Sequence, residues 1–142
     1  MTLKRRNLEI ENRDYAYIGI DFDNTVVSDL FPEVGLSLGA EPILKKLIAN
    51  GHKLILWTIR SGEALDKAVD WFKQNDIELF GINENPEFEG DEQARKIYCD
   101  LYIDDRSLGI QYDALFDAPR NRVMRVVNWD SMREQLKLLN LI

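Results

Sequence analysis

Acidic residues gather at two places in the sequence, each at the end of an apolar segment. Asp21 and Asp23 end the first long apolar run, and Asp104 and Asp105 follow the short run Leu101–Ile103. Carboxylate oxygens are the ligands that Mg²⁺ prefers, and two carboxylates beside a buried strand are costly unless a cation pairs with them. Carboxylates also act as nucleophiles and as general acids or bases. The two acidic pairs therefore indicate a metal site that is equipped for chemistry.

Two hydroxyls and a lysine occupy comparable positions. Thr25 follows the first acidic pair, Thr58 ends the apolar run 53–58, and Lys96 precedes the second acidic pair. In an open parallel sheet, ligands bind beyond the carboxyl ends of the strands. If the apolar runs are neighbouring parallel strands, we expect all of these side chains to converge on one crevice.

The elements that must position these residues alternate between strand and helix. Apolar positions at helical spacing predict helices at 41–50 and 63–75, and a capping box from Ser131 to Glu134 predicts the start of a last helix. The alternation predicts an α/β fold, a Rossmann-like three-layer sandwich with a mainly parallel central sheet. Strands are expected at 15–22, 53–58, 79–82, 101–103 and 122–128, and a brief helical turn at 93–97.

Length and composition fit a single domain spanning residues 1–142. The chain is 45% hydrophobic and 30% charged, which is enough apolar material for a core without disulfides. Its one cysteine, Cys99, favours a reducing compartment such as the cytoplasm. No apolar run approaches the roughly 18 residues of a membrane span, and the net charge of −7 argues against nucleic acid as a partner.

The motifs resemble those of the haloacid dehalogenase-like (HAD) superfamily. Its D-x-D-x-T signature is matched by Asp21-Phe22-Asp23-Asn24-Thr25, and its three remaining motifs are matched in order by Thr58, Lys96 and Asp104-Asp105. The resemblance covers residues 18–106. An acid at position 23 is typical of the phosphatases of this superfamily, whereas the dehalogenases lack it. The resemblance therefore implies a small phosphatase-type member.

The resemblance also implies a role for each motif residue. Asp21 would be the nucleophile that forms an aspartyl-phosphate, and Asp23 would be the general acid and base. Lys96 would hold Asp21 and the transferring phosphoryl group by its charge, and Thr58 would donate a hydrogen bond to that group. The cofactor would be Mg²⁺, and its implied ligands are Asp21, the backbone carbonyl of Asp23, and Asp104, with Asp105 supporting the site.

Individual predictions apply to several other polar residues and to Cys99. Thr25 and Thr58 are predicted to bind substrate. Arg60 either contacts the substrate or is a solvated arginine at the entry of a helix. His52, between a helix stop and a strand start, is predicted to be a surface histidine, and Cys99 is predicted to pack as a small hydrophobe.

The stretch 26–40 leaves room for a hairpin flap but not for a cap domain. A cap-less site excludes water less completely. A bulky substrate or a second subunit would then complete the pocket, or the enzyme would act on many small phosphates. The predicted partner is a small phosphorylated metabolite, and neither nucleic acid nor a membrane is expected to bind. A homo-oligomer is one way to close the site.

Other functions compete with a phosphatase. A phosphotransferase, a phosphatase of macromolecules and a non-catalytic phosphate- or metal-binding domain of the same fold remain open. In a receiver domain the threonine and lysine follow the central aspartate, whereas here Thr58 and Lys96 precede the second acidic pair. A dinucleotide-binding domain needs a glycine-rich turn after its first strand, and none is present.

Overall fold

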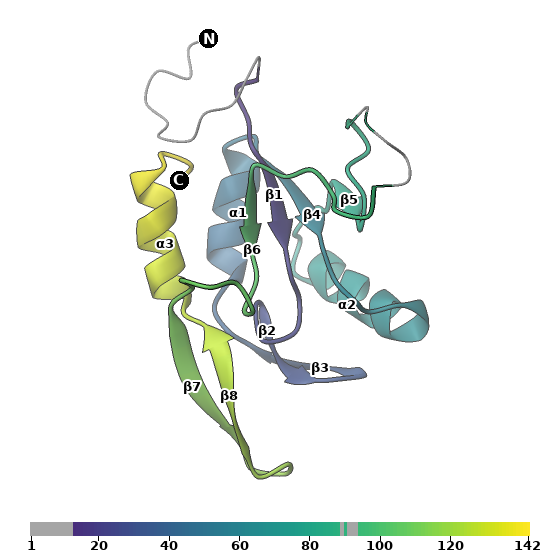
Figure 1. Ribbon diagram of the computed structural model, residues 1–142, viewed down its shortest axis with the longest axis vertical. Helices are drawn as coiled ribbons and strands as arrows, with labels where there is room; N and C mark the ends of the chain where they lie inside the picture. Colours follow the sequence, from purple (N-terminus) through teal and green to yellow (C-terminus); the bar gives the residue numbers. More distant parts are fainter. Residues whose placement is uncertain (1–12, 89, 91–93) are drawn as a thin grey trace.

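A four-stranded parallel sheet forms the centre of the protein (Figure 1). The computed structural model describes residues 13–88, 90 and 94–142. The sheet has the order β5-β4-β1-β6, and its strands are β1 (Tyr17–Ile20), β4 (Lys53–Leu56), β5 (Gly81–Ile82) and β6 (Leu101–Ile103). Ile20 at the end of β1 lies beside both Leu56 and Ile103. The carboxyl ends of β4, β1 and β6 therefore meet at one edge, with β1 in the middle.

One face of the sheet packs against the helices. Ile18 and Ile20 of β1, which point to the same face because side chains alternate along a strand, belong to the large buried cluster. All three helices contribute side chains to this cluster. They are α1 (Glu41–Ala49), α2 (Gly62–Gln74) and α3 (Trp129–Leu138).

The opposite face is covered by an irregular segment. Tyr17 and Ile55 pack there against Ile97 and Cys99. Cys99 is buried as predicted, and burial raises the pKa of its thiol to about 12. Residues 94–97 are not helical, so the helical turn predicted there is wrong for its described part; residue 93 lies outside the described residues.

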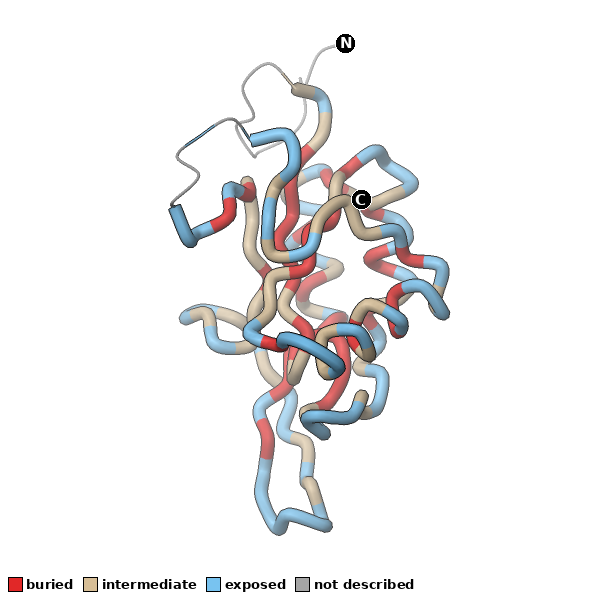
Figure 2. Tube along the Cα trace, turned by 90° about the vertical axis from the view of Figure 1, so that its right-hand side faces the viewer, coloured by how far each residue is buried: buried red, intermediate tan, exposed pale blue. Residues whose placement is uncertain are grey.

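Two antiparallel hairpins lie at the carboxyl edge of the sheet (Figure 1). The first, β2 (Val27–Leu30) with β3 (Glu33–Ser37), is the predicted flap. The second, β7 (Tyr112–Asp117) with β8 (Arg122–Val127), extends away from the body, and most of its length is exposed (Figure 2).

The predicted α/β sandwich with a mainly parallel sheet is confirmed. The last predicted strand exists as β8, but it pairs with β7 outside the central sheet. The last helix begins at Trp129, and its N-cap is Asn128, whose side chain accepts a hydrogen bond from Ser131 N at 2.8 Å. The predicted capping box is therefore wrong, because an asparagine three residues earlier caps the helix.

His52 is also placed differently from the prediction. Its side chain is buried, with Nδ1 accepting a hydrogen bond from Ala16 N at 3.0 Å and Nε2 lying 3.1 Å from the carbonyl oxygen of Leu141. Sequence neighbours alone suggested a surface turn, but the C-terminus folds back over it. No helix in the described part of the chain is long and apolar enough to cross a membrane.

Candidate active site

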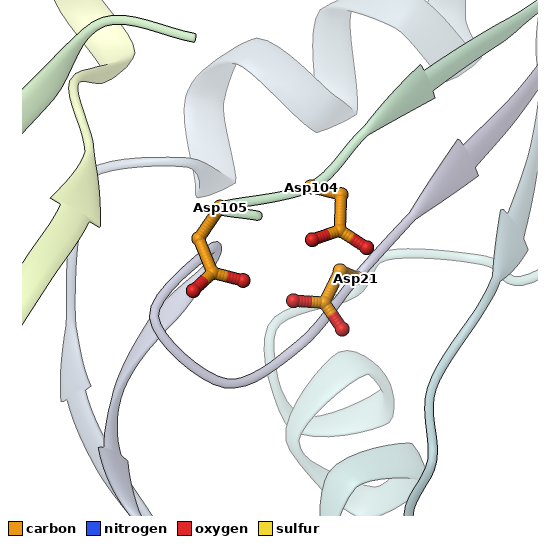
Figure 3. Close-up of side chains that lie close together, drawn as sticks. All are labelled: Asp21, Asp104 and Asp105. Atoms are coloured by element: carbon orange, nitrogen blue, oxygen red, sulfur yellow. The ribbon is translucent and has the colours of Figure 1, made fainter. Parts of the chain in front are cut away.

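Three carboxylates converge at the carboxyl ends of the two adjacent strands β1 and β6 (Figure 3). Asp21 follows β1, and Asp104 and Asp105 follow β6. One oxygen from each carboxylate lies within 4.8 Å of the other two. The strand ends are tied together, because Asp21 N donates a hydrogen bond to Ile103 O at 3.0 Å. The predicted convergence of the two acidic pairs is thus present for these three residues.

The three carboxylates lie close enough for their negative charges to repel one another. Burial, together with the hydrogen bond to Asp105 and the charge of Asp104, raises the pKa of Asp21 to about 8. Burial also raises the pKa of Asp105. Carboxylates this close resist ionising together unless positive charge is supplied. Three oxygen donors of this kind match the preference of a hard divalent cation such as Mg²⁺, so the residues fit the implied metal.

Thr25 lies behind the cluster and holds two of its members. It is fully buried, and its hydroxyl donates to Asp21 Oδ2 at 2.8 Å and accepts from Asp105 N at 3.0 Å. Thr25 was predicted to bind substrate, but in this geometry its hydroxyl is fully buried and bonded within the protein. Its hydroxyl is used to fix the orientation of Asp21 and the backbone of Asp105.

Arg60 and Asp23 form a bidentate ion pair beside the cluster. Arg60 Nε donates to Asp23 Oδ2 at 2.8 Å, and Nη2 donates to Oδ1 at 2.7 Å. The Arg60 side chain is completely buried, whereas 23% of the Asp23 side chain is exposed. Arg60 is therefore not a solvated arginine: its guanidinium is buried and positions Asp23.

The β7–β8 hairpin and the helix after it support both acidic loops. The hydroxyl of Tyr112 donates to Asp105 O at 2.6 Å. Trp129 Nε1 donates to Thr25 O at 2.7 Å, and Val127 N donates to Asn24 O at 3.0 Å. The loops that carry the catalytic candidates are therefore fixed by a part of the chain in which the sequence shows no motif.

A cavity of about 350 Å³ opens over the acidic cluster. Asp23 lines it beside Asp21, although it is not one of the three clustered carboxylates. Thr58 lines it too, and its hydroxyl accepts a hydrogen bond from Arg60 N at 3.1 Å. The lining residues are Asp21, Asp23, Asn24, Asp29, Phe31, Thr58, Ile59, Asp104, Asp105 and Arg106.

Lys96 is not brought into this cavity. Its ammonium group lies 5.3 Å from the centre of the Tyr102 ring, and the residue lines a neighbouring cavity with Asn83 and Asn85. No ion pair joins Lys96 to Asp21 within residues 13–88, 90 and 94–142. This geometry differs from the arrangement that the resemblance implies.

Arg106 is a site residue that the motif analysis missed. Among the described residues that line the cavity, Arg106 alone carries a positive charge. It follows Asp105 directly, and its backbone N donates to Asp104 Oδ1 at 2.8 Å. A cation directly after an acidic pair is the signal that could have identified it.

Comparison with known proteins gives one informative match. No family model and no curated protein matches the chain. The solved structure of a conserved protein from Bacteroides thetaiotaomicron is 31% identical, with a TM-score of 0.69. The match covers 87% of this chain and 90% of that one.

The chain belongs to the same family as this Bacteroides protein. The two proteins therefore share the fold over most of both chains.

Proposed function

We propose that this protein is a Mg²⁺-dependent phosphohydrolase of the HAD type, with Asp21 as its nucleophile. The observation that carries the proposal is the cluster of Asp21, Asp104 and Asp105 at the ends of β1 and β6, with Asp23 in the same cavity. A substrate-sized opening over a carboxylate of raised pKa is typical of a functional site.

The metal would be held by Asp21, Asp104 and Asp105. When bound, Mg²⁺ would neutralise the crowded carboxylates and the negative charge of the phosphate ester. A backbone carbonyl ligand from Asp23, as the resemblance implies, stays part of the proposal.

The side chains of the protein would carry the two chemical steps. A carboxylate oxygen of Asp21 attacks phosphorus, and the bond from phosphorus to the leaving alcohol oxygen breaks. Asp23 donates a proton to that oxygen and later takes a proton from the water that attacks the aspartyl-phosphate. Arg60 holds Asp23 in place for both transfers, and Thr25 holds Asp21.

Two groups compete for the role of binding the phosphoryl oxygens. The HAD resemblance favours Lys96, whereas the cavity lining favours Arg106. Thr58 lines the cavity and remains the proposed hydroxyl donor.

The substrate class we propose is a small phosphomonoester in a reducing, cytoplasmic compartment. The single cysteine supports the compartment, since Cys99 is buried as a free thiol. A second subunit that covers the open cavity stays a separate possibility, which gel filtration of the active protein would test.

The decisive assay measures phosphate release from p-nitrophenyl phosphate and a panel of small phosphomonoesters. Turnover should require Mg²⁺, stop with EDTA, and disappear in the Asp21→Asn variant. The matched control is Asp66→Asn, an exposed aspartate of α2 that should keep full activity. Absence of turnover from folded wild-type protein with Mg²⁺ on every ester would contradict the proposal and favour a binding domain.

A further inference from the structure

The mouth of the cavity carries two apolar side chains that the proposed chemistry does not use. Phe31 lies at the turn of the β2–β3 flap and is 52% exposed, and Ile59 lies after β4 and is 101% exposed. Both line the same cavity as Asp21. Single exposed apolar residues are common on protein surfaces. Two of them at the opening of one polar cavity call for a more specific explanation.

Phe31 is held in place on several sides. Its N–H donates to Asp29 Oδ1 at 3.0 Å, and its carbonyl accepts from Arg120 at 3.3 Å. The guanidinium of Arg60 lies 5.2 Å from the centre of its ring and donates to the carbonyl of Pro32 at 2.9 Å. The backbone of Phe31 is therefore held at the opening with its ring beside the Arg60 guanidinium, which lowers the entropy lost on binding.

Ile59 is fixed by its neighbours in the chain. Thr58 N donates to Asn83 Oδ1 at 2.9 Å, and Arg60 N donates to Thr58 Oγ1 at 3.1 Å. The side chain of Arg60, directly after Ile59, is itself buried. The Ile59 side chain is thus exposed by the anchoring of the residues on either side.

The strand order gives the cavity two chemically different sides. Ile59 follows β4 and Arg106 follows β6, and β1 with Asp21 lies between those strands. A phosphate above Asp21 therefore has the Arg106 cation on one side and the apolar residues on the other. The alcohol portion of the ester must leave the cavity past one of these sides.

We infer that Phe31 and Ile59 form a binding site for the leaving group, and that the enzyme prefers phosphomonoesters whose alcohol portion is apolar or aromatic. This inference rests on the proposed function. Between the two side chains, the apolar surface of the leaving group would be removed from water. That burial would favour apolar over polar leaving groups. Phe31 and Ile59 are specificity-determining residues in this account and take no part in bond breaking.

The test compares 2-phenylethyl phosphate with ethyl phosphate. Both are esters of primary alcohols, so the phosphorus chemistry is closely matched and the apolar group is the main difference. We expect wild-type kcat/KM to be about tenfold higher for 2-phenylethyl phosphate. Phe31→Ala and Ile59→Ala should each lower this preference about threefold or more, through a raised KM for 2-phenylethyl phosphate.

Two further variants separate recognition from structure. Phe31→Tyr keeps the aromatic face and should keep the preference. Leu36→Ala removes another exposed apolar residue of the same hairpin, 73% exposed and outside the cavity lining, and should change nothing. Equal kcat/KM for the two esters in the wild type, or a preference that survives both alanine variants, would overturn the inference.

Binding to the Asp21→Asn variant, measured by calorimetry with the same two esters, keeps the inference separate from the proposed function. If the wild type turns over neither ester, the proposed function fails, and the calorimetric preference alone decides the inference. Tighter binding of 2-phenylethyl phosphate that Phe31→Ala removes supports it. Equal affinity for the two esters, or no binding of either, overturns it.

Discussion

The carboxylate of Asp23 is held at both oxygens by the buried guanidinium of Arg60, at 2.8 and 2.7 Å. The same guanidinium donates to the carbonyls of Pro32 and Glu33 in the flap and to that of Ala64 in α2. All five N–H groups of an arginine are thereby used. The position of the proposed general acid and base is consequently coupled to the position of the flap over the cavity.

Replacing Arg60 should therefore damage both stability and turnover. We expect Arg60→Lys to lower the free energy of unfolding by about 3–5 kcal/mol, because lysine cannot replace the buried guanidinium that donates to Asp23 and to three backbone carbonyls. Turnover should fall about 100-fold, since lysine cannot reproduce the bidentate geometry. Urea unfolding and steady-state assays measure the two effects.

Lys67→Ala is the matched control for Arg60→Lys. Lys67 pairs with the carboxylate of Glu33 at 2.6 Å, and the two side chains are 41% and 59% exposed. Its loss should cost less than about 1 kcal/mol. Equal effects of the two substitutions would contradict the coupling of Asp23 to the flap through Arg60.

Thr25→Val tests whether the buried hydroxyl positions the nucleophile. The substitution conserves shape but leaves Asp105 N without its acceptor and Asp21 without its donor. We expect a loss of about 1–3 kcal/mol of stability and at least about a tenfold loss of kcat. Thr25→Ser retains the hydroxyl and should recover most of kcat; failure of serine to do so would refute a positioning role.

Arg106→Ala tests which cation binds the phosphate. We expect KM for a phosphomonoester to rise about ten- to hundredfold, because a charged hydrogen-bond donor is removed from the cavity. Lys96→Ala should have a smaller effect, since Lys96 lines a different cavity. A loss of turnover in Lys96→Ala with little change in Arg106→Ala would return this role to Lys96, as the HAD resemblance implies.

Asp100 should make stability depend on acid pH. Burial by itself would raise the pKa of Asp100, but hydrogen bonds from Arg13 at 2.8 Å and from Tyr17 N at 2.7 Å outweigh it, and the pKa is lowered. A lowered folded-state pKa stabilises the protein at pH values above the pKa of the unfolded state, which is about 3.9. That contribution is lost as the pH falls through the folded-state pKa.

Asp100→Asn should therefore be less stable than wild type at pH 7, by about 1–2 kcal/mol. The difference should shrink as the pH falls below about 4. Urea unfolding of both proteins between pH 3 and pH 7 measures it, with Asp66→Asn as the exposed control. A stability difference that stays constant with pH would contradict the role of the Asp100 ion pair.

Local sequence was sufficient to predict the parallel sheet and the meeting of its acidic ends. Apolar runs such as Leu54–Leu56, bounded by turns and alternating with helical spacing, leave few arrangements other than a parallel sheet. Asp21 and Asp104 could be placed together because parallel strands end at a common edge. The β7–β8 hairpin was not predictable in the same way, since β7 has exposed and half-buried positions without a clear alternation.

The sequence by itself determined the fold class and the placement of Asp21 and Asp104 at a common edge of the sheet, because strand periodicity and chain direction are local properties. Only the tertiary structure decided which polar side chains face the cavity. Thr25 and Arg60 turn inward to hydrogen-bond partners from distant segments, and Arg106 lies in the lining while Lys96 does not. A side chain's burial depends on what packs over it, and for these residues that covering comes from elements far away in the chain.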